Sequence, residues 1–135
     1  MEGQWQYRIL IVDNDEAAAS VIKNFLVGDG FDVTTACGGE VALNALQSCD
    51  YDLVLVDNHL ADLTSSCFLK QLLRIPGKSP VIVMESSPSR PCGLAPYNPF
   101  RASRFVNKWR ACEILEAVRE ARCAPPDSEA NQSGD

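Results

Sequence analysis

The 135-residue sequence contains one histidine, His59, and this scarcity excludes most histidine-based chemistry. A Ser-His-Asp or Cys-His catalytic site would have to use that single residue. Six cysteines are present, but none forms a Cys-x-x-Cys pair, so the usual zinc-binding spacings are absent. We therefore expect reduced cysteines that serve mainly in packing, with Cys37, Cys67 and Cys112 as small buried groups.

Long apolar runs and an excess of basic charge are also missing. No stretch approaches the roughly 18 apolar residues that a membrane-spanning helix needs, and the first residues do not resemble a secretory signal. A net charge of −6 argues against direct binding to nucleic acid, which needs a clustered basic surface. We therefore expect a cytoplasmic protein without membrane or nucleic-acid partners.

The length suits one domain that buries its own core. We expect this domain to span residues 1–123. The residues from Ala124 onward are polar and carry no apolar anchors. The sequence therefore predicts a disordered tail over residues 124–135.

Short apolar runs alternate with amphipathic segments along the chain. The runs Ile9–Val12 and Leu53–Val56 each stop at a carboxylate, which is typical of strands buried on both faces of a parallel sheet. The spacing of other apolar residues predicts three more strands, at 31–36, 80–84 and 104–108. Helices are expected at 16–28, at 40–48, between 64 and 76, and at 110–122. This alternation predicts an α/β fold with a doubly wound, mostly parallel five-stranded sheet.

Two further predictions concern the start of the helix at 16–28 and the segment before the last strand. Asp15 is expected to cap the helix at 16–28, in which Val21 and Phe25 belong to the apolar face. Residues 86–103 contain four prolines, which remove backbone donors. We expect this segment to form a Pro-rich loop in place of a fourth helix.

The carboxyl ends of the first, third and fifth strands meet where the winding of such a sheet reverses. This arrangement brings Asp13, Asp57 and Lys108 together. Facing acids repel each other, and a hard divalent cation such as Mg²⁺ relieves that repulsion. A lysine opposite them would bind the charge of a phosphoryl group carried on Asp57. The chemistry indicated is the formation of an acyl phosphate.

Three motifs in this order, Val12–Asp15, Leu55–Asp57 and Phe105–Lys108, resemble the CheY-like receiver domain of two-component response regulators. The resemblance covers about Arg8 to Arg122. It implies a flavodoxin-like sheet in the order 2-1-3-4-5. It also implies that a histidine kinase or phosphotransfer protein transfers a phosphoryl group to Asp57.

The same resemblance assigns roles to other residues. Mg²⁺ would be held by Asp13, Asn14, Asp57 and the backbone carbonyl of His59. Lys108 would contact the phosphate, together with a Ser or Thr at the end of strand four, and Phe105 would be a switch residue. Aligning on Pro80 puts Glu85 at that Ser/Thr position, whereas counting back from Lys108 favours Ser86, and this choice stays open.

Several residues depart from the family pattern. Asn14 replaces an acid, which removes a charge from the metal site and weakens Mg²⁺ binding. Trp109 follows Lys108 where the family has a proline. We expect Trp109 to pack against the protein rather than to mark an exposed surface.

Three functions follow from these observations. The first is a single-domain receiver that is no enzyme beyond slow self-dephosphorylation and signals through a downstream protein partner, with homodimerisation left open. The second is a degenerate receiver that acts as a phosphorylation-independent interaction module. The third is a haloacid-dehalogenase-type phosphatase using Asp13, because Asp13-x-Asp15 resembles that nucleophile motif. Ala17 and the lack of room for a cap domain argue against the third.

Overall fold

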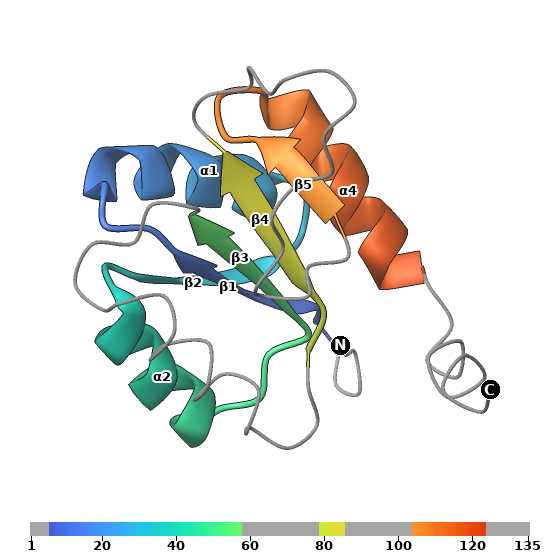
Figure 1. Cartoon of the computed structure of the whole chain (residues 1–135). Helices are drawn as coiled ribbons and strands as arrows, with labels where there is room; N and C mark the ends of the chain where they lie inside the picture. The colour runs from blue at the N-terminus through green and yellow to red at the C-terminus, as the bar shows by residue number, and fades with distance from the viewer. Residues whose placement is uncertain (1–5, 58–78, 86–103, 124–135) are drawn as a thin grey trace, which may run out of the picture.

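One parallel sheet organises the computed structural model, which describes residues 6–57, 79–85 and 104–123. Within these ranges the strand order is β2-β1-β3-β4-β5 (Figure 1). The strands are β1 (Arg8–Val12), β2 (Asp32–Ala36), β3 (Leu53–Asp57), β4 (Val81–Glu85) and β5 (Arg104–Asn107). The helices are α1 (Glu16–Gly28), α2 (Gly39–Ser48) and α4 (Ala111–Cys123). The predicted α/β fold and its strand order 2-1-3-4-5 are confirmed.

Strand β1 lies where the winding of the sheet reverses. It pairs in parallel with β2 on one side and with β3 on the other, so that Val12 lies beside both Ala36 and Val56. Strand β3 then pairs with β4, which places Asp57 beside Met84. The residues that follow β1 and end β3 therefore meet at the same edge of the sheet, where ligands bind in open α/β folds.

The sheet buries apolar side chains on both faces because side chains alternate along each strand. Helices α1 and α4 cover one face and α2 covers the other (Figure 1). On the first face, the core joins strand residues such as Ile11 and Leu55 to Ile22 of α1 and Ile114 of α4. On the second, the remaining strand residues pack against Ala42 and Leu43 of α2. Strands apolar on both sides thus become the middle of a three-layer domain.

Both ends of α1 are set by local chemistry. Asp15 is the N-cap, and its Oδ1 accepts a hydrogen bond from the Ala18 N–H at 3.2 Å, as predicted. After the helix, Gly30 takes a φ of +96°, a left-handed conformation that only glycine adopts without strain. The cap fixes the direction in which the chain leaves β1, and with it the position of the acids before the helix.

Several burial predictions are wrong. Only a narrow stripe of α1 faces the sheet, through Ala18, Ala19, Ile22 and Leu26. Val21 and Phe25 lie beside this stripe and are exposed. Cys37 follows the end of β2 and is exposed. Cys112 is exposed as well, because it lies about 200° around α4 from the buried Ile114.

The element bounds differ from the predicted ones by a single residue in several places. Strand β4 continues to Glu85, and β5 ends at Asn107, so that Lys108 lies in the following turn. The third helix, the Pro-rich loop and the tail of the prediction lie outside the described residues. Among the described helices, none is both long and apolar enough to cross a membrane.

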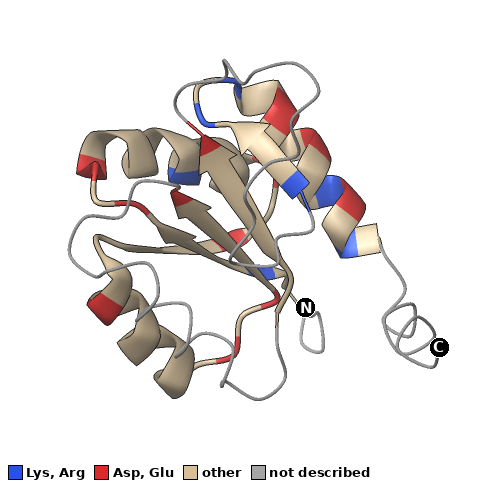
Figure 2. Cartoon of the chain, viewed as in Figure 1, with Lys and Arg blue, Asp and Glu red and all other residues tan. Residues whose placement is uncertain are grey.

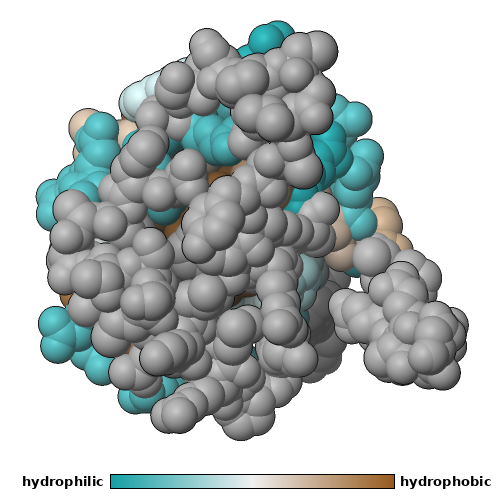
Figure 3. All heavy atoms as spheres, viewed as in Figure 1, coloured by the Kyte–Doolittle hydropathy of each residue, from teal (hydrophilic) through white to brown (hydrophobic). Residues whose placement is uncertain are grey.

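Charged residues, coloured on the ribbon, occur along the helices and near the strand ends (Figure 2). Where described atoms are visible along the rim of the space-filling view, most belong to hydrophilic residues (Figure 3). One surface pair links two elements of the same layer, because Arg119 of α4 donates hydrogen bonds to Asp29 after α1 at 3.2 and 2.8 Å.

Candidate functional site

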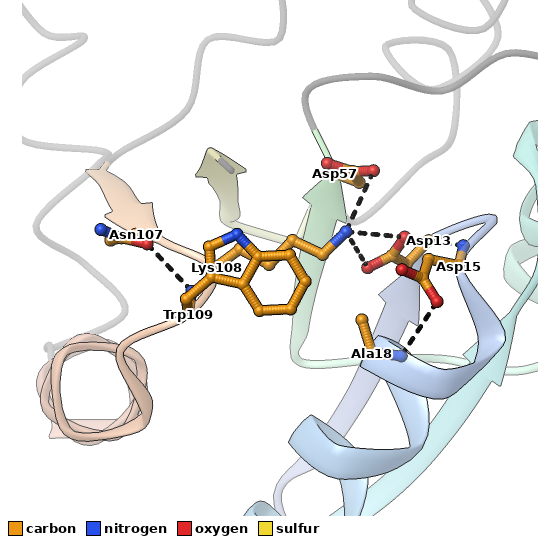
Figure 4. Close-up of polar contacts among 7 residues, drawn as sticks. All are labelled: Asp13, Asp15, Ala18, Asp57, Asn107, Lys108 and Trp109. Atoms are coloured by element: carbon orange, nitrogen blue, oxygen red, sulfur yellow. Dashed lines mark hydrogen bonds and ion pairs between the residues drawn. The ribbon is translucent and has the colours of Figure 1, made fainter. Parts of the chain in front are cut away.

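Three charged side chains converge at the carboxyl edge of the sheet. Asp13 follows β1, Asp57 ends β3, and Lys108 follows β5 (Figure 4). They are the buried charged residues of the described part of the chain, with exposed fractions of 0%, 4% and 6%. The structure therefore brings together the three residues that the strand pattern predicted to meet.

The lysine bridges the two acids. Lys108 Nζ lies 2.9 Å from Asp13 Oδ2 and 3.2 Å from Asp13 Oδ1. It lies 3.5 Å from Asp57 Oδ2. Two carboxylates thus share one ammonium, with the shorter contact to Asp13.

Strand register explains this meeting. Val12 lies beside Val56, so the next residues, Asp13 and Asp57, stand at the same level on neighbouring strands. Strand β5 is two strands from β3, about 10 Å away, and only a long side chain spans that gap. The backbone of Lys108 is fixed for this reach, because its N–H donates to the carbonyl oxygen of Glu85 at 2.8 Å.

Burial raises the pKa of the Asp13 carboxyl, and the negative charge of Asp57 adds to this effect. A hydrogen bond from the Asp15 N–H at 3.0 Å and the ammonium of Lys108 oppose the rise. For Lys108, burial alone would lower the pKa. The hydrogen bond to Asp13 and the charges of both acids outweigh burial, so the pKa of Lys108 is raised and the ammonium form is favoured.

Two buried carboxylate oxygens at this site, Asp13 Oδ2 and Asp57 Oδ1, have no hydrogen-bond partner in the described part of the chain, although Asp13 Oδ2 is ion-paired to Lys108. Asp57 Oδ1 is buried and accepts nothing from the described part of the chain. A buried, unpaired carboxylate oxygen costs free energy unless a cation or another group reaches it. The same part of the chain contains no cluster of three acidic, His or Cys side chains. Mg²⁺ commonly uses one or two carboxylates and keeps several waters, so Asp13 and Asp57 fit that donor set.

The two residues after Asp13 differ in their surroundings. The side chain of Asn14 is exposed. Asp15 uses its carboxylate to cap α1 and its N–H to hold Asp13. Asp15 therefore orients an acid of the site, and the metal role predicted for Asn14 stays a prediction.

The end of β4 bears on the open choice between Glu85 and Ser86. Met84 is the β4 residue beside Asp57, and Glu85 lies beside Asn107. Because side chains alternate along a strand, Glu85 projects toward the face opposite to Asp57. Phe105 is half-buried and packs against the core on the α2 side. Ser86 and His59 lie outside the described residues, and all four assigned roles stay predictions.

The expectation that Trp109 packs against the protein is wrong, since 60% of this residue is exposed. Its ring lies beside the site, with Lys108 Nζ 5.2 Å from the ring centroid (Figure 4). Lys108 and Trp109 also line a groove of about 750 Å³ between α1 and α4, together with Val21 and Phe25. Adjacency to Lys108 was the signal in the sequence that pointed to this tryptophan.

Comparisons with known proteins identify relatives of the chain. The family model described as the response regulator receiver domain matches residues 9–119. The cell cycle transcriptional regulator CtrA of Caulobacter vibrioides is 31% identical over 80 residues, which are 59% of this chain and 35% of that protein. The uncharacterized transcriptional regulatory protein YkoG of Bacillus subtilis is 32% identical over 117 residues, or 84% of this chain and 50% of that protein. The chain thus spans about a third to a half of these relatives.

Solved structures share the fold. A CheY-like receiver domain from Methylobacillus flagellatus gives a TM-score of 0.73 at 22% identity, covering 87% of this chain and 99% of that one. The response regulator TrrA from Thermotoga maritima, in complex with Mg²⁺ and BeF, gives 0.72 at 24% identity, covering 86% and 99%. At these identities the likeness concerns the fold alone.

Proposed function

Because the chain belongs to the response regulator receiver domain family, we propose that Asp57 accepts a phosphoryl group from a phosphohistidine of a histidine kinase or phosphotransfer protein. Receiver domains generally act as phosphoacceptors rather than as enzymes. The observation that carries the proposal is the buried group of Asp57, Asp13 and Lys108 at the carboxyl edge of the sheet. In this group, Asp13 Oδ2 and Asp57 Oδ1 have no hydrogen-bond partner in the described chain, but Asp13 Oδ2 is ion-paired to Lys108 at 2.9 Å, which leaves Asp57 Oδ1 as the oxygen open to a new bond.

The reaction is a transfer between two nucleophiles. An oxygen of the Asp57 carboxylate attacks phosphorus, the N–P bond of phosphohistidine breaks, and its electron pair stays on the imidazole nitrogen. The product is an acyl phosphate on Asp57. Lys108 keeps its positive charge within 3.5 Å of Asp57 Oδ2, where it offsets the charge that the phosphoryl group brings.

We propose Asp13 and Asp57 as the side chains that hold Mg²⁺, with Asn14 and the His59 carbonyl as further ligands. Bound Mg²⁺ would supply positive charge to the phosphoryl oxygens during transfer. Its affinity is modest in this proposal, because Asn14 brings no charge and Lys108 already pairs with both acids.

Phosphorylation with a small donor tests the proposal. The protein is incubated with acetyl phosphate and Mg²⁺, and its intact mass is measured. We expect one added phosphoryl group in the wild type and none in Asp57→Asn. Asp50→Asn is the matched control, since it removes the same charge from an exposed position. Addition that persists in Asp57→Asn would place the phosphoacceptor elsewhere.

A second candidate function is the interaction module that works without phosphorylation. The exposed Asn14 favours it, because an uncharged amide attracts a metal less than the carboxylate of the family pattern does. No phosphoryl addition with acetyl phosphate or with a cognate kinase would support this alternative over the first.

The phosphatase alternative fits the structure least well. Asp13 has no exposed surface and is ion-paired to Lys108, which disfavours it as a nucleophile. Turnover of a phosphomonoester that depends on Asp13 would reverse this judgement.

In the favoured proposal, the protein acts in the cytoplasm and signals through protein contacts without binding DNA directly.

A further inference from the structure

Trp109 and Lys108 are neighbours in the chain with opposite surroundings. Trp109 is 60% exposed, whereas Lys108 is 6% exposed. The indole lies alongside the lysine side chain, and the lysine carries its ammonium past the ring toward Asp13 and Asp57 (Figure 4). A lysine is seldom so deeply buried, and this one lines the open groove between α1 and α4 together with the adjacent ring.

A tight turn holds the indole in this place. The Trp109 N–H donates to Asn107 Oδ1 at 2.9 Å, and the Arg110 N–H donates to the Asn107 carbonyl oxygen at 3.1 Å. On the other side, the Lys108 N–H is bound to the carbonyl oxygen of Glu85. The position of the ring thus comes from the backbone of the turn, which explains why so exposed a side chain keeps its contact.

The ring acts directly on the ammonium. Its centroid lies 5.2 Å from Lys108 Nζ, within the distance at which the face of an indole attracts a cation. Because Lys108 is buried, water screens its interactions with the ring and with the carboxylates only weakly.

We propose that Trp109 is a positioning residue, whose indole holds the Lys108 ammonium on Asp13 and Asp57. The contact itself is independent of phosphorylation. Its consequence for phosphoryl transfer rests on the function proposed above, in which the charge of Lys108 acts on the phosphoryl group.

A double-mutant cycle tests the contact without any phosphoryl donor. Urea unfolding is measured for the wild type, Trp109→Ala, Lys108→Met and the double variant in metal-free buffer. We expect the two substitutions to be non-additive, with a coupling of about threefold to tenfold in the unfolding equilibrium constant. Additive effects would overturn the proposal. Because Trp109 is largely exposed, Trp109→Ala is expected to fold.

Fluorescence gives an independent signature. Trp5→Phe leaves Trp109 as the single tryptophan, since the sequence has two. In this background we expect Lys108→Met to shift the emission maximum, because a charge beside the ring is removed. Lys23→Met is the control, since it removes an equal charge from the middle of α1. Equal emission from all three proteins would count against the contact.

The rate of phosphorylation by acetyl phosphate tests the consequence. We expect Trp109→Ala to lower the initial rate about threefold to tenfold and Trp109→Phe to restore most of it, since phenylalanine keeps an aromatic face. Val21→Ala is the matched control, because Val21 lines the same groove and is 67% exposed. An equal loss in Val21→Ala, or none in Trp109→Ala, would overturn the proposal. If the wild type takes no phosphoryl group, the proposed function fails, and the double-mutant cycle decides alone on Trp109.

Discussion

Replacing Asp57 by asparagine should stabilise the metal-free fold, even though it removes an ion pair. The pair with Lys108, at 3.5 Å, contributes an attraction of about 4.7 kcal/mol at an effective dielectric constant of about 20. The oxygens of Asp13 and Asp57 lie 2.9 and 3.5 Å from the same nitrogen, so they are at most 2.9 plus 3.5, or 6.4 Å, apart. Their repulsion is therefore at least about 2.6 kcal/mol.

The sign of the net change depends on the cost of burying the charge. Asp57→Asn removes both the attraction to Lys108 and the repulsion from Asp13, and the net loss of stability from these two terms is about 2 kcal/mol. The same substitution removes a buried carboxylate charge, and this recovers its desolvation cost of several kcal/mol. We therefore expect Asp57→Asn to raise the free energy of unfolding by about 1 to 2 kcal/mol. For a domain of this size, that is a rise in Tm of roughly 4 to 8 °C.

Thermal unfolding in buffer with EDTA measures this effect. Asp50→Asn again serves as the control, because it changes the net charge equally from an exposed position and should alter stability by less than about 0.5 kcal/mol. A Tm below that of the wild type in Asp57→Asn would refute the reasoning, because the ion pair would then outweigh both repulsion and burial.

The site and its surroundings support three further predictions. Mg²⁺ should raise the Tm of the wild type, by the equivalent of about 2.7 kcal/mol at 100 times its Kd, and should raise that of Asp57→Asn much less in the same titration. Burial raises the pKa of the Asp13 carboxyl above 3.8, its ordinary value. The neutral carboxyl therefore contributes to stability below that pH, and this contribution is lost as the pH rises through the folded-state pKa. Urea unfolding of the metal-free wild type and of Asp13→Asn from about pH 4 to about pH 8 should therefore show a difference in stability that moves in favour of the variant, and a constant difference would contradict this. Gly30→Ala should cost about 1 kcal/mol through its φ of +96°, whereas Gly28→Ala, with equally open space, should cost nothing or stabilise the helix; equal urea midpoints for the two variants would contradict the argument.

The convergence of Asp13, Asp57 and Lys108 could be predicted because it depends on topology. Apolar runs that end in charged residues predict parallel strands, and the carboxyl ends of such strands lie at one edge. The last residue of each strand then decides which side chains meet at that edge, and the predicted strand ends were correct to one residue. Asp15 could be predicted for a similar reason, since helix capping is a local property of the chain.

The groove beside the site could not be predicted in the same way. Periodicity gives the direction of an apolar face of a helix but not its covered width, which depends on how closely the neighbouring helix packs. Val21 and Phe25 are exposed because α1 and α4 leave a groove between them. For Trp109, the sequence shows its neighbour but not the turn at Asn107 that directs the ring.

The unequal sharing of Lys108 makes the site chemically asymmetric. Of the four carboxylate oxygens of Asp13 and Asp57, three lie within 3.5 Å of Lys108 Nζ. The fourth, Asp57 Oδ1, has its lone pairs free of the lysine, so it is the better nucleophile of the two Asp57 oxygens. In the proposed reaction, phosphorylation would then be regioselective, and Oδ2 would become the carbonyl oxygen of the mixed anhydride. The lysine that would receive the charge of the phosphoryl group would thus also select the atom that carries it.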